Sequence, residues 1–125
     1  MAVPILKQGP VLIASIQTAL TDTDVLQLRE DVMAQVTRHR SRGIIVDVTA
    51  LDVMDSFVST SLRGIAHMTR LRGAETVIVG IQPEVAFAMV QLGMNFEDVH
   101  TALDLEEGLA FLKQQLNGEQ EPGGG

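Results

Sequence analysis

The chain has 125 residues and a formal net charge of −7, which gives it the size of one small domain and argues against nucleic acid or an anionic membrane as its main partner. Aromatic residues make up only 3%, which argues against a base-stacking or sugar-stacking surface. Cysteine is absent, which excludes disulfides and thiolate sites, and no run reaches the roughly 18 apolar residues of a membrane helix. We therefore expect a cytoplasmic protein that acts through other proteins.

The first half of the chain predicts an edge strand, a second strand, a helix and a buried strand. A strand is expected over 11–16, and residues 4–7 supply an edge strand before it. The segment 22–24 offers helix caps, and the basic segment 38–43 ends the helix. Its three arginines form a basic patch on one interpretation; the favoured interpretation is that they complement the helix dipole. The apolar run 43–48 is typical of a strand buried on both faces of a parallel sheet. Apolar residues follow the first cap at helical spacing: Val25, Leu28, Val32 and Val36.

The second half continues the alternation of helices and strands. A helix begins near Asp55 and Ser56 and ends near 71–73, and its apolar stripe holds Val58, Leu62, Ile65 and Thr69. The remaining elements follow in order: a strand over 76–81, a helix from Pro83 to Leu92 stopped by Gly93, a short strand over 99–103, and a helix capped by Asp104 with Leu105, Leu109, Leu112 and Leu116 on one stripe. This alternation indicates an α/β domain with a mostly parallel sheet over 1–117. Residues 118–125 are expected to be a disordered tail.

The sequence offers no catalytic constellation. Ser56 and His67 lie on one predicted helix, about 16 Å apart along its axis, and cannot act as nucleophile and base. The histidines have no metal-ligand spacing, and the common nucleotide and hydrolase motifs are missing. We therefore expect no enzymatic activity, no metal and no cofactor.

Asp47, near the end of the strand over 43–48, admits two interpretations. It is the phosphoacceptor if the chain is a response-regulator receiver domain, which is also α/β and of similar length. A receiver needs a pair of acids after its first strand, a hydroxyl residue after its fourth and a lysine after its fifth. Here residues 17–19 read Gln-Thr-Ala, and the only lysines are Lys7 and Lys113. Asp47 is therefore predicted to be a hydrogen-bonding residue at the strand end.

The segment 48–57 is the most informative, because sites on open α/β sheets lie at the carboxyl ends of strands. Asp55 is expected near the N-cap of the following helix and Ser56 in its first turn. Free backbone N–H groups and the helix dipole favour an added phosphate there, which makes Ser56 a suitable phosphoacceptor. On spacing alone, the alternative is that Asp55 and Ser56 simply cap the helix.

The loop Asp47-Val-Thr-Ala-Leu-Asp-Val-Met-Asp-Ser56 resembles the phosphorylation loop of the STAS domain, the anti-sigma-factor-antagonist family. The order of elements matches that family along almost the whole chain. Phe57 and Val58 stand where the family commonly has small residues. The sequence Asp55-Ser56-Phe57 and the segments 11–17, 80–86 and 101–106 resemble the RsbS-type subgroup of this family. Proteins of that subgroup are the single-domain scaffolds of the bacterial stressosome. The resemblance implies a single STAS domain whose phosphorylation loop lies at the N-terminus of the second of four helices.

The resemblance implies a scaffold for other proteins. Such a protein assembles with itself and with an RsbR-type paralogue that carries an N-terminal sensor domain, and the assembly sequesters an RsbT-type serine kinase. Phosphorylation of Ser56 releases the kinase, and an RsbX-type phosphatase resets the system. Four residues beside Ser56 are expected to support the loop and contact the partner: Asp55, Met54, Phe57 and Val58. At least one of Phe57 and Val58 is expected to lie partly in the core.

Further expectations concern secondary sites and assembly. Thr23 and Thr60 are candidate secondary phosphosites, although a capping role is favoured for Thr23. Self-association is expected because one small core need not hold all of Phe87, Met94 and Phe96, and those left outside it would be exposed to a second copy. The alternative function is a STAS interaction or small-ligand-binding module that is not phosphorylated.

Overall fold

Strands and helices alternate along the chain in the computed structural model, which describes residues 3–94, 96 and 98–120. The predicted α/β class is confirmed, and every strand and helix expected from the sequence is present. In chain order the elements are β1 (Ile5–Gln8), β2 (Val11–Ser15), α1 (Asp22–His39), β3 (Gly43–Asp47), α2 (Ser56–Leu71), β4 (Glu75–Val79), α3 (Pro83–Gln91), β5 (His100–Ala102) and α4 (Leu105–Gln120).

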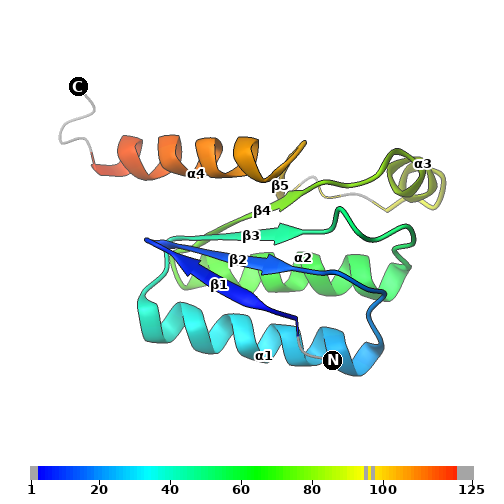
Figure 1. The fold of residues 1–125 in the computed structure, drawn as a ribbon, viewed down its shortest axis with the longest axis horizontal. Helices are drawn as coiled ribbons and strands as arrows, with labels where there is room; N and C mark the ends of the chain where they lie inside the picture. Colours follow the sequence, from blue (N-terminus) through cyan, green and yellow to red (C-terminus); the bar gives the residue numbers. More distant parts are fainter. Residues whose placement is uncertain (1–2, 95, 97, 121–125) are drawn as a thin grey trace.

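The five strands form one sheet in the order β1-β2-β3-β4-β5 (Figure 1). The predicted edge strand β1 is antiparallel to β2, and the other neighbours are parallel. Because β2, β3 and β4 pair in register, they begin together at one edge of the sheet and end together at the other. We call the edge where they begin, at Val11, Gly43 and Glu75, the amino edge, and the edge where they end, at Ser15, Asp47 and Val79, the carboxyl edge.

Helices cover both faces of the sheet. In Figure 1, α1 and α2 lie side by side beneath the sheet and α4 lies above it. Strand side chains alternate between the two faces and fill two cores. The larger core, against α1 and α2, includes Leu12, Ile44 and Ile78, and the smaller core, under α4, includes Ile13, Ile45 and Val77. The central strands are therefore buried on both faces, as predicted.

The first helix begins one residue earlier than a cap at 22–24 would allow. Thr21 is the N-cap: its hydroxyl accepts the backbone N–H of Asp24, and the Asp24 carboxylate accepts the backbone N–H of Thr21, each at 3.1 Å. The capping role predicted for Thr23 is therefore wrong. Thr23 is instead an exposed residue of the first helical turn, because the reciprocal pair on either side of it closes the cap.

The helices beneath the sheet bury the stripes that their spacing predicts. α1 buries all four predicted residues, and α2 does the same. The buried hydroxyls of Thr69 on α2 and Thr76 on β4 lie 2.9 Å apart and are hydrogen-bonded. This bond gives both buried polar groups a partner and ties α2 to the sheet.

The fourth helix lies close to the sheet at a glycine. A Cβ on Gly108 would lie 2.8 Å from Cγ1 of Val79 and 3.4 Å from Cδ1 of Ile45, so a side chain at this position would force the helix away. Of the predicted stripe, Leu112 is fully buried, whereas Leu105, Leu109 and Leu116 are half-buried.

The end of α4 corrects the predicted boundary of the tail. The helix continues to Gln120, so residues 118–120 are helical. Glutamate and glutamine are good helix formers and extend the last turn past Gly118. The other residues of the expected tail, 121–125, lie outside the described residues.

Candidate functional site

The loop that carries Ser56 leaves the carboxyl edge of the sheet at Asp47, the last residue of β3. The Asp47 carboxylate accepts hydrogen bonds from the backbone N–H of Thr49, at 2.9 Å, and from its hydroxyl, at 2.6 Å. These bonds close a tight turn directly after the strand. They confirm the predicted role of Asp47 as a hydrogen-bonding residue at the strand end.

The same turn is held from the neighbouring β4–α3 connection. The side-chain amide of Gln82 donates a hydrogen bond to the carbonyl of Thr49, at 2.6 Å. Gly80 makes the close approach possible: its φ is +80°, and a Cβ there would lie only 3.0 Å from the Cβ of Thr49. Sequence reasoning missed these two residues as parts of the site. The signal available was a glycine directly after a buried strand, followed two residues later by an amide side chain.

Asp55 and Ser56 occupy the start of α2 as predicted. Asp55 is the N-cap, and its carboxylate accepts the backbone N–H of Val58 at 2.8 Å. Its carbonyl accepts the backbone N–H of Ser59 at 3.0 Å. Ser56 follows as the first helical residue. Its side chain is exposed, and within the described part of the chain its hydroxyl makes no hydrogen bond.

This geometry suits an added phosphate. The backbone N–H groups of the first helical turn and the positive end of the α2 dipole both favour a negative group. Because Asp55 already caps the helix, the Ser56 hydroxyl has no structural task at this position. The site therefore combines an accessible nucleophilic oxygen with a helix end that tolerates the charge of a phosphate.

The apolar residues around Ser56 divide between the surface and the core. Met54 and Val58 are buried in the larger core, which corrects the expectation that their side chains contact a partner and confirms that at least one of Phe57 and Val58 lies in the core. Phe57 is 41% exposed and fits the expectation of partner contact. Val53 is 70% exposed, and sequence reasoning did not single it out. The exposed apolar groups that flank Ser56 in sequence are therefore Val53 and Phe57.

The loop is acidic, and no cation among the described residues forms an ion pair with its carboxylates. Asp52 and Asp55 are both exposed, and among the described residues neither takes part in an ion pair. The nearest cation along α2 is Arg63, about 10 Å from Ser56 along the helix axis. Arg63 is paired with Asp98 at 3.5 Å. A phosphate on Ser56 would therefore add to an uncompensated negative charge.

The secondary candidates differ in access. Thr60 is exposed one helical turn after Ser56, and Thr23 is exposed in the first turn of α1. Ser59, beside Thr60, is buried. His67 lies on α2 with Ser56, as predicted, and its Nε2 lies 3.7 Å from a carboxylate oxygen of Asp98. His67 therefore lies beside Asp98, eleven residues along the chain from the candidate phosphoacceptor Ser56.

The three apolar residues that need not all fit the core, Phe87, Met94 and Phe96, differ in their exposure. Phe96 is buried, Met94 is half-buried, and Phe87 on α3 is 65% exposed. Val90 and Leu92 are also exposed, at the end of α3. We call Phe87 and Val90, which are three residues apart and so lie on one side of α3, the α3 apolar patch.

Across residues 3–94, 96 and 98–120, no group of three or more metal-ligating side chains comes together. The helices found in the same residues also lack the combination of length and apolar character needed to cross a bilayer.

Comparison with known proteins identifies similar chains. The family model of the STAS domain matches residues 2–108. A solved structure of RsbS from Moorella thermoacetica, in a variant with a serine replaced by glutamate, has a TM-score of 0.80 and 34% identity, covering 92% of this chain and 97% of that one. A chain from a structure of the stressosome, described as a signal integration and transduction hub, has a TM-score of 0.78 and 34% identity, covering 90% of this chain and 98% of the other.

A curated relative extends beyond the matched region. The RsbT co-antagonist protein RsbRA of Bacillus subtilis (strain 168) is 31% identical over 83 residues, or 66% of this chain. The match spans only 30% of the length of that relative.

Proposed function

This chain belongs to the STAS-domain family, and we propose that it is a non-enzymatic stressosome scaffold that binds a serine kinase and releases it when Ser56 is phosphorylated. Similarity to RsbS over nearly the whole of both chains supports this role. The observation that carries the proposal is that Asp55 already caps α2, while the exposed Ser56 hydroxyl makes no hydrogen bond with any described residue. In the Moorella relative a serine is replaced by glutamate, a residue that supplies a negative charge as a phosphate does.

The switch acts through the surface around Ser56. Val53 and Phe57 offer exposed apolar contact area beside the serine, which a docked kinase covers. A phosphoserine adds about −1.5 to −2 charges, and removing that charge from water beneath a partner is costly. Asp52 and Asp55 already make the surface acidic, so acidic groups of the kinase meet additional repulsion. Because the start of α2 tolerates a phosphate, the fold survives modification and only the docking is lost.

The proposed partners rest on the resemblance to the RsbS-type subgroup. The kinase is of the RsbT type, a phosphatase of the RsbX type restores the unmodified serine, and a sensor-bearing paralogue of the RsbR type joins the cytoplasmic assembly. Resemblance to RsbRA over part of its length supports pairing between STAS domains. The α3 apolar patch offers a surface for contact between copies.

The direct test is phosphorylation in vitro. The protein is incubated with an RsbT-type kinase and Mg-ATP, and its modification is located by mass spectrometry. We expect one phosphate on Ser56, no phosphate on Ser56→Ala, and full modification of the matched control Thr60→Ala. Absence of modification in the wild type contradicts the proposal and supports a STAS interaction or ligand-binding module that is not phosphorylated. Modification at Thr23 or Thr60 alone moves the switch to that residue.

A further inference from the structure

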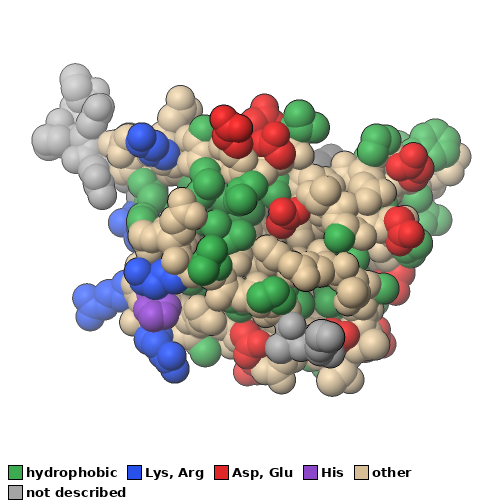
Figure 2. Space-filling model, viewed as in Figure 1, with side chains coloured by type: hydrophobic (Ala, Val, Ile, Leu, Met, Phe, Trp, Pro, Cys, Tyr) green, Lys and Arg blue, Asp and Glu red, His purple; other side chains and the backbone are tan. Residues whose placement is uncertain are grey.

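The end of the molecule opposite Ser56 is strongly basic. Figure 2 shows Lys and Arg side chains gathered at the left end of the view, where α1 ends, while Asp and Glu side chains lie elsewhere on that face. This end holds the amino edge of the sheet, because α1 and α2 run back from the carboxyl edge and finish there. The basic residues belong to three segments: Arg38, His39 and Arg40 at the end of α1, Arg42 before β3, and Arg72 after α2.

An open cleft lies among these basic residues. It has a volume of about 540 Å³ and lies between the end of α1, the start of β3 and the end of α2. Arg40, Arg42 and Arg72 line it, and none of its lining residues is acidic. We call it the amino-edge cleft. Its volume is within the range of small-molecule sites in proteins.

The helix dipoles favour a cation at the end of each helix, but they do not explain why arginines from three segments line one cleft. Cations in the last turn of a helix complement its dipole, which explains Arg38 and His39 on α1. Arg42 lies outside both helices, at the entrance to β3, and Arg72 comes from a second helix, yet both line the cleft that Arg40 lines. Three guanidinium groups from separate segments therefore surround one space. Among the described residues, Arg40 and Arg72 take part in no ion pair.

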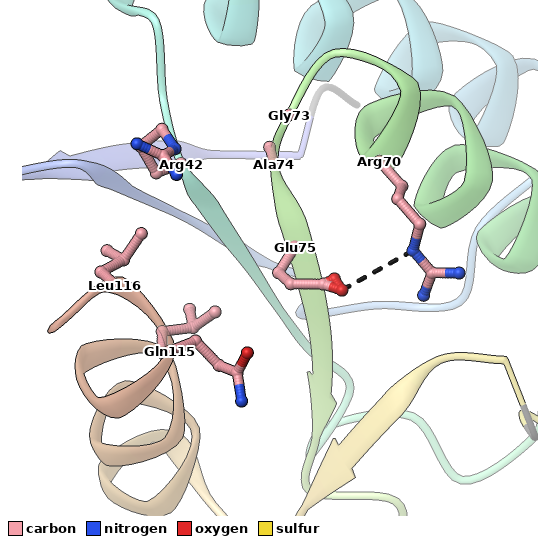
Figure 3. A pocket seen from close by; sticks show the side chains of 8 residues that line it. Arg42, Arg70, Gly73, Ala74, Glu75, Gln115 and Leu116 are labelled. Atoms are coloured by element: carbon pink, nitrogen blue, oxygen red, sulfur yellow. Dashed lines mark ion pairs between the residues drawn. The ribbon is translucent and has the colours of Figure 1, made fainter. Parts of the chain in front are cut away.

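A second cavity, which Arg42 also lines, differs from the amino-edge cleft in its charge. Its volume is about 190 Å³, and it lies between the end of α4 and the start of β4 (Figure 3). There the Nε of Arg70 lies 3.6 Å from a carboxylate oxygen of Glu75. The smaller cavity therefore contains an acid that pairs with Arg70, whereas none of the described residues that line the amino-edge cleft is acidic.

Two local features indicate a polar ligand in the amino-edge cleft. Ser41 also lines it, and its buried hydroxyl has no hydrogen-bond partner among the residues that the structure describes. Buried hydroxyls normally have a partner, so the wall of the cleft holds an unmade hydrogen bond that a ligand oxygen reaching this hydroxyl would complete. In addition, Arg40 adopts a left-handed conformation, with φ at +50°, at a helix C-cap where glycine fits without strain. This position therefore holds an arginine, although glycine would adopt the left-handed conformation without strain.

From these observations we propose that the amino-edge cleft binds a phosphate monoester. Guanidinium groups recognise phosphate oxygens through paired, charge-assisted hydrogen bonds, and the two charges of Arg40 and Arg72 balance a dianion. The ligand has two sources with the same chemistry: a free phosphate ester, or a phosphorylated Ser56 loop of a second copy. Because Ser56 lies at the carboxyl edge and the cleft at the amino edge, a loop reaching the cleft must come from another molecule.

The test is a titration of the full chain followed by NMR of its backbone amides at low salt. The probes are inorganic phosphate, a peptide spanning residues 50–62 with phosphoserine at position 56, and the same peptide without phosphate. We expect saturable shifts at residues 37–43 and 72–74 with both phosphate-bearing probes, weakening as salt is added. Tighter binding of the phosphopeptide identifies a second copy as the source, and equal binding identifies a free ester.

Variants separate a site from general attraction. Arg40→Gly suits the left-handed backbone, and Arg72→Gln changes an exposed side chain, so both variants keep the fold. Each is expected to weaken phosphate binding about tenfold, and Arg29→Gln, outside the cleft, to leave it unchanged. The proposal is overturned if neither phosphate-bearing probe saturates, if the two cleft variants bind like the wild type, or if the unphosphorylated peptide binds as tightly as the phosphopeptide. Because the probes carry their own phosphate, none of these results bears on whether a kinase modifies Ser56.

Discussion

The side-chain amide of Gln82 donates a hydrogen bond to the carbonyl of Thr49 across 2.6 Å, and so joins the β4–α3 connection to the loop that positions Ser56. Gln82→Ala removes this bond. We expect a loss of about 1 kcal/mol in the free energy of unfolding and faster hydrogen exchange at the amides of residues 48–54. Urea unfolding and hydrogen exchange measure the two effects, with the exposed Gln114→Ala as the control. Unchanged exchange in Gln82→Ala would show that the loop is held by Asp47 alone.

Val53 is expected to be a contact for the kinase. Because the side chain is 70% exposed, Val53→Ser should change the free energy of unfolding by no more than about 0.5 kcal/mol. Removing apolar area from the centre of a docking surface should weaken kinase binding about tenfold. Leu71→Ser, at the other end of α2, is a matched control because Leu71 is also exposed. Titration calorimetry decides the matter, and equal affinity in the two variants would place the kinase elsewhere.

Phe87 is expected to hold copies of the protein together. Phe87→Glu places a charge in the α3 apolar patch and should reduce the mass of the assembly, because burying an unpaired charge between copies is costly. Light scattering measures that mass, with Leu71→Glu as the control for a charge added elsewhere. An unchanged mass for Phe87→Glu would exclude the α3 apolar patch from the interface.

Acid is expected to loosen the first turn of α1. The backbone N–H of Thr21 donates to the Asp24 carboxylate and holds the pKa of Asp24 below its ordinary value of 3.8. Because the pKa is lower in the folded state, the stabilisation is complete above the ordinary value and is lost as the pH falls through the lowered pKa. Cα chemical shifts of residues 21–25 between about pH 5 and about pH 2 report this change. Asp24→Asn should remove the pH dependence; if its shifts move as in the wild type, another group is responsible.

The sequence predicted the parts of the fold that depend on local pattern. Helical spacing identified the buried stripe of α1, and apolar runs between turn signals identified β3 and β4. The bond from Gln82 to Thr49 joins residues 33 positions apart, and it depends on the register of neighbouring strands that no local pattern records.

The same limit explains the corrections around Ser56. Its place at the start of α2 could be predicted because Asp55 is a good N-cap residue. Loop residues have no period, so the sequence did not reveal that Met54 points into the core while Val53 is exposed. Arg40 and Arg72 are far apart in sequence, and they line one cleft only because α1 and α2 pack side by side and end at the same edge of the sheet.

The central claim is that a phosphate on Ser56 releases the kinase, and kinase retention by the immobilised protein with Mg-ATP tests it most directly. Ser56→Ala removes an exposed hydroxyl while Asp55 still caps α2, so it should keep the fold and retain the kinase when the wild type has released it. Ser56→Asp should bind the kinase weakly without ATP, with a partial effect because aspartate carries one charge where phosphoserine carries nearly two. If folded Ser56→Ala releases the kinase as readily as the wild type does, Ser56 is not the switch.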